Sequence, residues 1–252
     1  GGALKDNSDL EKGVLTGILR VAKESIFSGL NNLGVYSLLH SPFAEYFGFT
    51  EAEVEKILQD ADLSEHRQAV REWYNGYRFG KSTIYNPWSI LQFVDNPGDG
   101  VCPFWINTSA NELIRDLISR SDSLLQQELE ILLGGGTIFS PLNDNISLRD
   151  ITISHQSIWN FLVFCGYLKP VSRQEQDLEP LYELAIPNRE VRYFFHTTIR
   201  QWVNQQLGEQ SLHPLLIALV EVDLETFADI LQYIVLHTLS FHDVAGAEPE
   251  RV

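Results

Sequence analysis

The sequence contains no methionine, not even at position 1, and it has only two cysteines. A chain that opens on Gly1-Gly2-Ala3 without an initiator is expected to be a fragment of a longer protein, or a sequence from which a modified methionine has been dropped. Cys102 and Cys165 are too few for a disulfide framework or a cysteine-based zinc cluster, and their scarcity favours a reducing, cytoplasmic setting.

Long apolar runs and positive charge are also scarce. The longest apolar runs, such as Leu215 to Val220, are far too short to span a bilayer, and no signal peptide opens the chain, so we expect no membrane association. There are 18 Lys and Arg against 34 Asp and Glu, which gives a net charge of −16. Because non-specific binding to a phosphodiester backbone needs positive charge, we expect weak or no DNA binding by this chain, although one basic face is not excluded.

The sequence does contain enough apolar material for a sizeable core. It has 252 residues, of which 44% are hydrophobic and 21% are charged, an ordinary balance for a globular protein. At about 150 residues per domain, this length predicts one or two domains.

Local patterns predict one strand and then a series of helices in the first part of the chain. The apolar run from Lys12 to Leu19, with glycines at its start and middle, is typical of a strand buried on both faces of a parallel sheet. Capping residues and helix breakers then predict the ends of three helices. These are a capping box at Thr50–Glu53, a helix from about Ser64 that ends at Asn75-Gly76, and a helix that begins at Asn86-Pro87.

The stretch from Ser157 to Trp202 has the clearest architectural pattern. A helix that ends at Gly166 precedes two predicted strands, Tyr167–Val171 and Leu181–Ile186, and a further helix begins at Asn188. Helix, hairpin and helix in this order indicate a winged-helix module. The remaining helices are predicted around Leu113–Ile118, around Leu124–Leu133 with Gly134 as its end, and in two stretches between Ser211 and Leu239.

The segment Gly76-Tyr77-Arg78-Phe79-Gly80-Lys81-Ser82 is similar to a phosphate-binding loop but lacks one residue. The motif has four residues between its glycines, whereas this segment has three. Such a loop also follows a buried strand and opens a helix, and this segment follows a helix. We therefore interpret it as a turn that ends the helix.

Two groups of side chains are candidates for nucleotide contacts. Arg20 and Lys23 lie just past the predicted buried strand, at the edge where open α/β sheets bind ligands, although a solvated basic pair explains them as well. An aromatic group around two glycines could stack on a base and offer donors to an anion, and it could equally be core. Its members are Tyr74, Tyr77, Arg78, Tyr85 and Trp88.

No residues are assigned to catalysis or to a metal. His237, His242 and Asp243 are a weak metal set, because positions five apart do not share a helix face. No close carboxylate and lysine arrangement of the nuclease type is present in the sequence.

A series of short phrases resembles a bacterial family of AAA-ATPase-like proteins that often carry a C-terminal PD-(D/E)XK nuclease-like domain. They occur in order over about residues 14 to 195, the middle portion of that family's architecture. The phrases are Leu15-Thr16-Gly17 through Arg20, Lys23 to Leu33, Glu45 to Thr50, Trp73 to Tyr77, Tyr85 to Trp88, Trp105 to Ser109, Gly166-Tyr167-Leu168 and Ile186 to Glu190.

The resemblance implies a mainly α fold with minor β structure (α+β), made of the last part of a P-loop ATPase sheet, a helical lid and a winged-helix-like module. The family's P-loop and nuclease domain would lie outside this chain, so we expect no cofactor for the chain itself, and ATP and Mg²⁺ in the intact protein. By position, Thr16 would be a polar sensor, and Arg20 would face nucleotide together with the turn from Asn75 to Gly80.

We therefore expect three parts. Residues 1–100 would end the ATPase-like domain and form the lid, 101–210 would be helical and winged-helix-like, and 211–252 would be a helical linker. The nucleotide-binding candidates are Thr16, Arg20, Lys23, Gly76, Tyr77 and Arg78. The expected function is that of a nucleotide-dependent module coupled to nucleic-acid processing, itself non-catalytic. The alternative is a protein-interaction scaffold derived from an ATPase.

Overall fold

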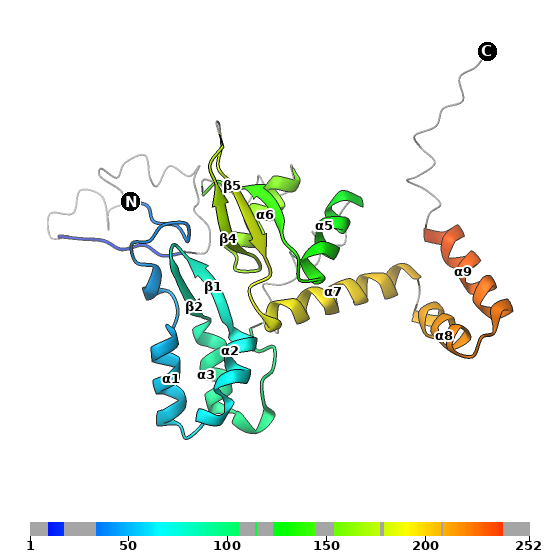
Figure 1. The fold of residues 1–252 in the computed structure, drawn as a ribbon, viewed down its shortest axis with the longest axis horizontal. Helices are drawn as coiled ribbons and strands as arrows, with labels where there is room; N and C mark the ends of the chain where they lie inside the picture. The colour runs from blue at the N-terminus through cyan, green and yellow to red at the C-terminus, as the bar shows by residue number, and fades with distance from the viewer. Residues whose placement is uncertain are drawn as a thin grey trace, which may run out of the picture. The chain divides into compact units, whose positions relative to one another are not determined.

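The computed structural model describes residues 10–17, 34–105, 114, 123–144, 154–176, 179–207 and 209–238. The chain divides into two compact units, Gly1–Phe195 and His196–Val252, which are described separately (Figure 1). The described residues form helices and two small antiparallel sheets, so the predicted α+β class is confirmed. The predicted division into three parts stays a prediction.

Local capping residues set the first helices. A short 3-10 turn, η1 (Ala44–Tyr46), precedes α1 (Glu51–Asp60). The predicted capping box is present, because the Glu53 N–H donates to Thr50 Oγ1 at 3.4 Å and the Thr50 N–H donates to Glu53 Oε2 at 2.8 Å. A second 3-10 turn, η2 (Ser64–His66), leads into α2 (Arg67–Tyr74), which confirms the predicted second helix.

A β-hairpin follows α2, and here the sequence interpretation was wrong. Helix α2 ends before Asn75 as predicted, but the chain then forms β1 (Asn75–Phe79) and β2 (Ser82–Tyr85) instead of a simple turn. The two-residue connection Gly80-Lys81 starts with a glycine at φ +53°, a conformation that hairpin turns use. The segment that is similar to a phosphate loop is therefore a hairpin.

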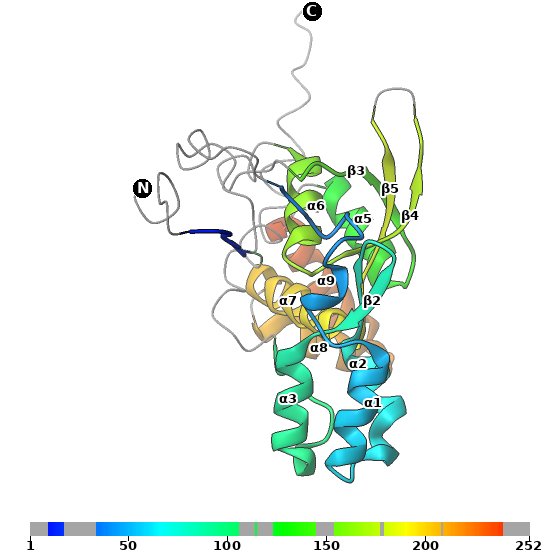
Figure 2. The same ribbon diagram turned by 90° about the vertical axis from the view of Figure 1, so that its left-hand side faces the viewer.

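Helix α3 (Pro87–Asp95) begins where Asn86-Pro87 predicted, and the Trp88 N–H donates to Asn86 Oδ1 at 3.0 Å. A 3-10 turn, η3 (Pro97–Asp99), follows it. Figures 1 and 2 show α1, α2 and α3 side by side. Their shared core consists of Val54, Leu58, Val70, Tyr74, Tyr85, Ile90 and Phe93, all nearly inaccessible to solvent.

A three-stranded sheet forms the other part of this unit. Its strands are β3 (Ile138–Pro141), β4 (Lys169–Gln174) and β5 (Leu181–Ala185), all antiparallel in the order β3-β5-β4. Two helices accompany the sheet, α5 (Ser123–Leu133), which ends at Gly134 as predicted, and α6 (His155–Phe164). The predicted hairpin is confirmed as β4–β5, and β3 was not predicted.

The start of β4 shifts by two residues from the prediction. Gly166 adopts φ +83° after α6, and the N–H groups of Tyr167 and Leu168 both donate to the Leu162 carbonyl, at 2.7 and 3.1 Å. This helix-ending turn uses the two residues that had been assigned to the strand.

Three helices complete the described chain: α7 (Arg189–Leu207), α8 (Glu209–Val220) and α9 (Leu224–Thr238). The predicted apolar stripe of α7 is buried at Val191, Phe194 and Phe195. The two apolar helices expected beyond Ser211 correspond to α8 and α9. Among the described helices, none has the length and apolar character needed to cross a membrane.

The predicted buried strand from Lys12 to Leu19 is wrong for the residues that the structure describes. Residues 12–17 have no strand pairing and lie exposed, with Val14 79% and Leu15 58% accessible. A strand buried on both faces needs paired neighbours, and the two sheets of the described residues are antiparallel and do not include this segment. Ile18 and Leu19 lie outside the described residues, as does nearly all of the helix predicted around Leu113–Ile118.

Candidate functional site

The two sheets of the first unit approach each other at Gly76 on β1. A Cβ atom at this position would lie 2.1 Å from the Pro187 carbonyl oxygen, and Gly76 has φ +120°. Only glycine combines this backbone conformation with so close an approach. The Gly76 N–H donates to Asn75 Oδ1 at 2.7 Å, so the Asn75 side chain fixes the start of the strand.

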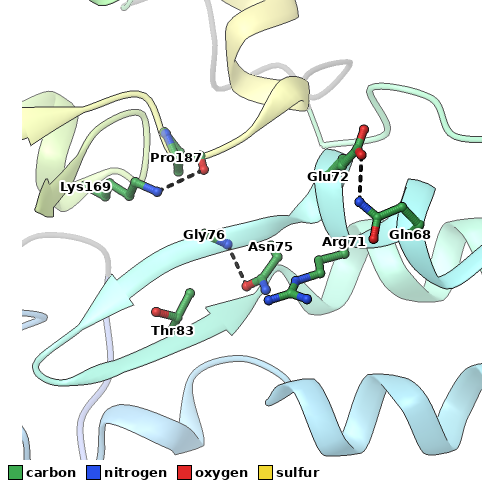
Figure 3. Close-up of a pocket in the computed structure, with 8 residues that line it drawn as sticks. All are labelled: Gln68, Arg71, Glu72, Asn75, Gly76, Thr83, Lys169 and Pro187. Atoms are coloured by element: carbon green, nitrogen blue, oxygen red, sulfur yellow. Dashed lines mark hydrogen bonds between the residues drawn. The ribbon is translucent and has the colours of Figure 1, made fainter. Parts of the chain in front are cut away.

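An open pocket of about 340 Å³ lies over this approach (Figure 3). Figure 3 shows Gly76 between the Lys169–Pro187 pair on one side and Asn75 on the other, with the Arg71 guanidinium beside Asn75. The pocket is thus built from the end of α2, the hairpin β1–β2, β4 and the loop before α7. Its lining residues are Gln68, Arg71, Glu72, Asn75, Gly76, Thr83, Lys169 and Pro187.

The carboxylates at the pocket already have partners. Glu72 accepts from Gln68 Nε2 at 2.8 Å and pairs with Arg189 at 2.9 Å. Glu51, from α1, accepts from the Tyr85 hydroxyl at 2.7 Å and from Asn75 Nδ2 at 3.2 Å. These bonds join α1, α2, β2 and the start of α7 at one place.

The cations are paired less completely. Arg71 Nε lies 3.8 Å from Glu51 Oε2, a loose ion pair on a guanidinium that is 56% exposed. Lys169 donates to the Pro187 carbonyl oxygen at 3.3 Å, and Arg78 Nε donates to the Gly80 carbonyl oxygen at 3.4 Å. Burial, and then the positive charge of Arg78, lower the pKa of Lys169.

A buried carboxyl group lies in the same unit. Glu190, in the first turn of α7, has no exposed surface, and it accepts from Ser89 Oγ and from the Trp105 N–H, each at 2.8 Å. Burial raises the pKa of Glu190 to about 7, although both hydrogen bonds favour the carboxylate and oppose this rise. Glu190 therefore connects α3, the segment at Trp105 and α7.

The structure separates the six nucleotide-binding candidates. Thr16 is exposed, and Arg20 and Lys23 lie outside the described residues. Gly76 lines the pocket, and Arg78 lies beside it, because its cross-strand partner is the pocket residue Thr83.

Tyr77 belongs to the interior of the unit instead of the pocket. Its ring packs edge-on against that of Trp105, with the ring centroids 6.3 Å apart, and burial raises the pKa of its hydroxyl. Glu72, a carboxylate that could have paired with Arg78 in place of a nucleotide, instead bonds Gln68 and Arg189.

Most of the aromatic group is core. Tyr74 and Tyr85 are 0% and 1% exposed, and the Tyr74 hydroxyl donates to the Cys102 carbonyl oxygen at 2.8 Å. Within this arrangement these rings cannot stack on a base. Trp88, by contrast, is 50% exposed.

Sequence reasoning missed the residues that give the pocket its charge. Lys169 was placed only within the predicted strand Tyr167–Val171, and Arg71 was not singled out. Glu190 was part of a family phrase, Ile186 to Glu190, without an assigned role. No spacing along the chain brings Arg71 near Lys169, so only the fold reveals the pocket.

In the described part of the chain, no group of three His, Cys, Asp or Glu side chains is arranged to hold a metal ion. The side chains of His237, His242 and Asp243 lie outside the described residues. Both cysteines are free thiols. Burial raises the pKa of Cys165 to about 12.

The chain is similar to a protein called an uncharacterized protein in the vnfD 5′ region of Azotobacter chroococcum mcd 1. The two are 27% identical over 184 residues, which cover 71% of this chain. The match covers 32% of the relative, so the chain spans about a third of that protein's length. No known family model matches the chain. No solved structure matches it either.

Proposed function

We propose that this chain is the non-catalytic lid and winged-helix-like part of a nucleotide-dependent, AAA-ATPase-like protein involved in nucleic-acid processing. In this proposal a P-loop outside these residues performs the hydrolysis with ATP and Mg²⁺. Arg78, together with Arg20, contacts the nucleotide phosphates. An Arg at such a position is apt, because a guanidinium is always charged and can fork onto a phosphate.

The observation that carries the proposal is the convergence of the family phrases on one junction. Trp73 to Tyr77 supplies Gly76, which lies against the Pro187 carbonyl of the Ile186 to Glu190 phrase. Tyr85 to Trp88 supplies Tyr85, whose hydroxyl bonds Glu51. Trp105 bonds Glu190 through its N–H. Phrases far apart in the sequence thus contact one another or their neighbours within one compact unit, which supports reading them as a single structural unit.

The order of elements supports the winged-helix part of the proposal. Helix α5, strand β3, helix α6 and the hairpin β4–β5 follow one another, and β3 pairs with β5, the strand farthest from it along the chain. Helix α6 is buried from Trp159 to Val163 and contains no Lys or Arg. A helix of this kind has little to offer DNA, which needs cationic contacts. We therefore propose weak or no DNA binding by the chain alone.

A steady-state ATP hydrolysis assay on the purified chain tests the non-catalytic part. We expect no turnover, because phosphoryl transfer requires a loop that positions the phosphates and Mg²⁺. Lys81, the lysine of the incomplete motif, lies instead in the two-residue turn of a hairpin. Turnover that survives further purification and disappears in Lys81→Ala would contradict the proposal.

The second candidate function is a protein-interaction scaffold, and one observation favours it. An aromatic strip, defined as Tyr36, Phe43, Tyr46 and Phe47, is exposed at 53%, 52%, 84% and 51%. Exposed aromatic side chains of this kind are common at protein interfaces. A GxxxxGK(S/T) motif in the longer reading frame would favour the nucleotide-dependent function, and its absence there would favour the scaffold.

A further inference from the structure

We propose that the pocket over Gly76 is a binding site for a phosphate-type oxyanion, held by Lys169 and Arg71 with Arg78 beside them. The inference rests on the proposed function only in naming a nucleotide as the physiological source of the phosphate. The site itself follows from the charges and donors at the pocket.

The charge balance at the pocket is opposite to that of the whole chain. Glu72 is engaged by Arg189 at 2.9 Å, and Arg71 lies 3.8 Å from Glu51, which also serves other donors. Lys169 and Arg78 make no ion pair within the part of the chain that the structure describes. The whole chain has a net charge of −16. Lys169 and Arg78, which are not neutralised by ion pairs with carboxylates among the described residues, therefore create a local positive potential at the pocket.

The donors reach the pocket from different elements. Lys169 on β4 and Arg71 on α2 both line it, and Thr83 on β2 adds a hydroxyl. Arg78 is the cross-strand partner of Thr83 on the hairpin, and its positive charge lowers the pKa of Lys169. Gly76 lies between Lys169 and Asn75 in the pocket lining, and its lack of a side chain lets the Pro187 carbonyl approach there (Figure 3).

The state of Lys169 favours an anionic ligand. Burial and the neighbouring guanidinium lower the pKa of its ammonium group, which means that the surroundings do not stabilise the positive charge of this group. A bound oxyanion supplies the missing opposite charge and raises that pKa again. A multiply charged phosphate group fits better than a carboxylate, because it offers more negative charge and more acceptor oxygens to the ammonium and the guanidinium.

The experiment is a calorimetric titration of the 252-residue chain with inorganic pyrophosphate and, separately, with ATP, at low ionic strength. Three variants are compared with the wild-type chain: Lys169→Gln, Arg71→Gln and the control Lys81→Gln. The control also removes one positive charge, but from the turn of the hairpin β1–β2, outside the pocket. Thermal unfolding of each variant establishes that it is folded. Arg71 is 56% exposed, so Arg71→Gln remains decisive if Lys169→Gln does not fold.

We expect pyrophosphate binding that weakens about tenfold in Lys169→Gln and in Arg71→Gln, the loss typical of one charged hydrogen bond, and that changes little in Lys81→Gln. A side-chain NMR titration should show the pKa of Lys169 rising when pyrophosphate is added. ATP binding tighter than pyrophosphate, with the same dependence on both variants, supports a nucleotide as the source. ATP binding no tighter than pyrophosphate leaves the site in place and contradicts the nucleotide part of the proposed function. Absence of pyrophosphate binding, or binding equal in all three variants, overturns the site.

Discussion

Replacing Glu190 by Gln gives the most detailed test of the packing around the junction. Glu190 is fully buried, and its two oxygens accept from Ser89 Oγ and the Trp105 N–H. Gln has nearly the same shape. Its oxygen can accept from the Trp105 N–H, and its amide can donate to the Ser89 hydroxyl, which then acts as an acceptor. The substitution therefore keeps both contacts and removes the titration.

The magnitude follows from the pKa of Glu190, which burial raises from 4.5 to about 7. The folded chain then holds a proton that the unfolded chain has already lost, so the free energy of unfolding falls as the pH rises between these two values. The full difference corresponds to about 3 kcal/mol, since each pKa unit is worth about 1.4 kcal/mol. About 2 kcal/mol of it lies between about pH 5.5 and about pH 8.

The assay is urea unfolding of the wild-type chain and Glu190→Gln at a series of pH values. Carboxyl groups whose pKa is lowered, such as Glu53 and Glu183, change stability with pH in the opposite direction, so the difference between the two proteins is the relevant quantity. We expect the free energy of unfolding of Glu190→Gln, measured relative to that of the wild type, to rise by about 2 kcal/mol between about pH 5.5 and about pH 8.

Two further variants complete this test. The exposed residue Glu130 on α5 supplies the control, Glu130→Gln, which should follow the wild-type profile. Glu190→Ala should be less stable than the wild type by about 3 kcal/mol at about pH 5.5, because two buried donors lose their acceptor and a cavity remains. Since this variant also lacks the titrating carboxyl group, the deficit should shrink by about 2 kcal/mol by about pH 8. A constant difference between Glu190→Gln and the wild type would refute the reasoning.

Two other predictions concern backbone and thiol chemistry. Gly76→Ala should destabilise the chain by about 3 kcal/mol or more, because its Cβ would lie 2.1 Å from the Pro187 carbonyl oxygen at φ +120°. Gly98→Ala, where nothing lies within 4 Å, is the control, and equal unfolding midpoints for the two variants would contradict the packing described at the junction. Burial raises the pKa of Cys165 to about 12, so this thiol should react with iodoacetamide far more slowly than Cys102 at about pH 8. The two single Cys→Ser variants allow each rate to be measured alone, and equal rates would contradict the burial of Cys165.

The local elements of this fold were predictable because their causes lie within a few residues. Thr50 and Glu53 define the start of α1 through their own hydrogen bonds, and Asn86 does the same for α3. The alternation and turn residues around β4 and β5 also lie within one short stretch, so that hairpin could be predicted.

The remaining elements depend on partners that are distant in sequence. Strand β3 is four residues long and ends in a proline, and only its pairing with β5 makes it a strand. The hairpin β1–β2 was missed because its first residues, Asn75-Gly76, were interpreted as a turn that ends the preceding helix. The pocket joins Arg71 on α2 to Lys169 on β4, and no periodicity along the chain links these two positions.

The nucleotide affinity of the longer protein that we propose contains this chain decides whether its arginines contact a nucleotide. Arg78→Ala and Arg20→Ala are compared with the wild-type protein by equilibrium titration with ATP. We expect each variant to lose ten- to hundredfold in affinity, about 1.5–3 kcal/mol, because a charged hydrogen bond to phosphate is removed. Unchanged affinity in both variants would contradict the account.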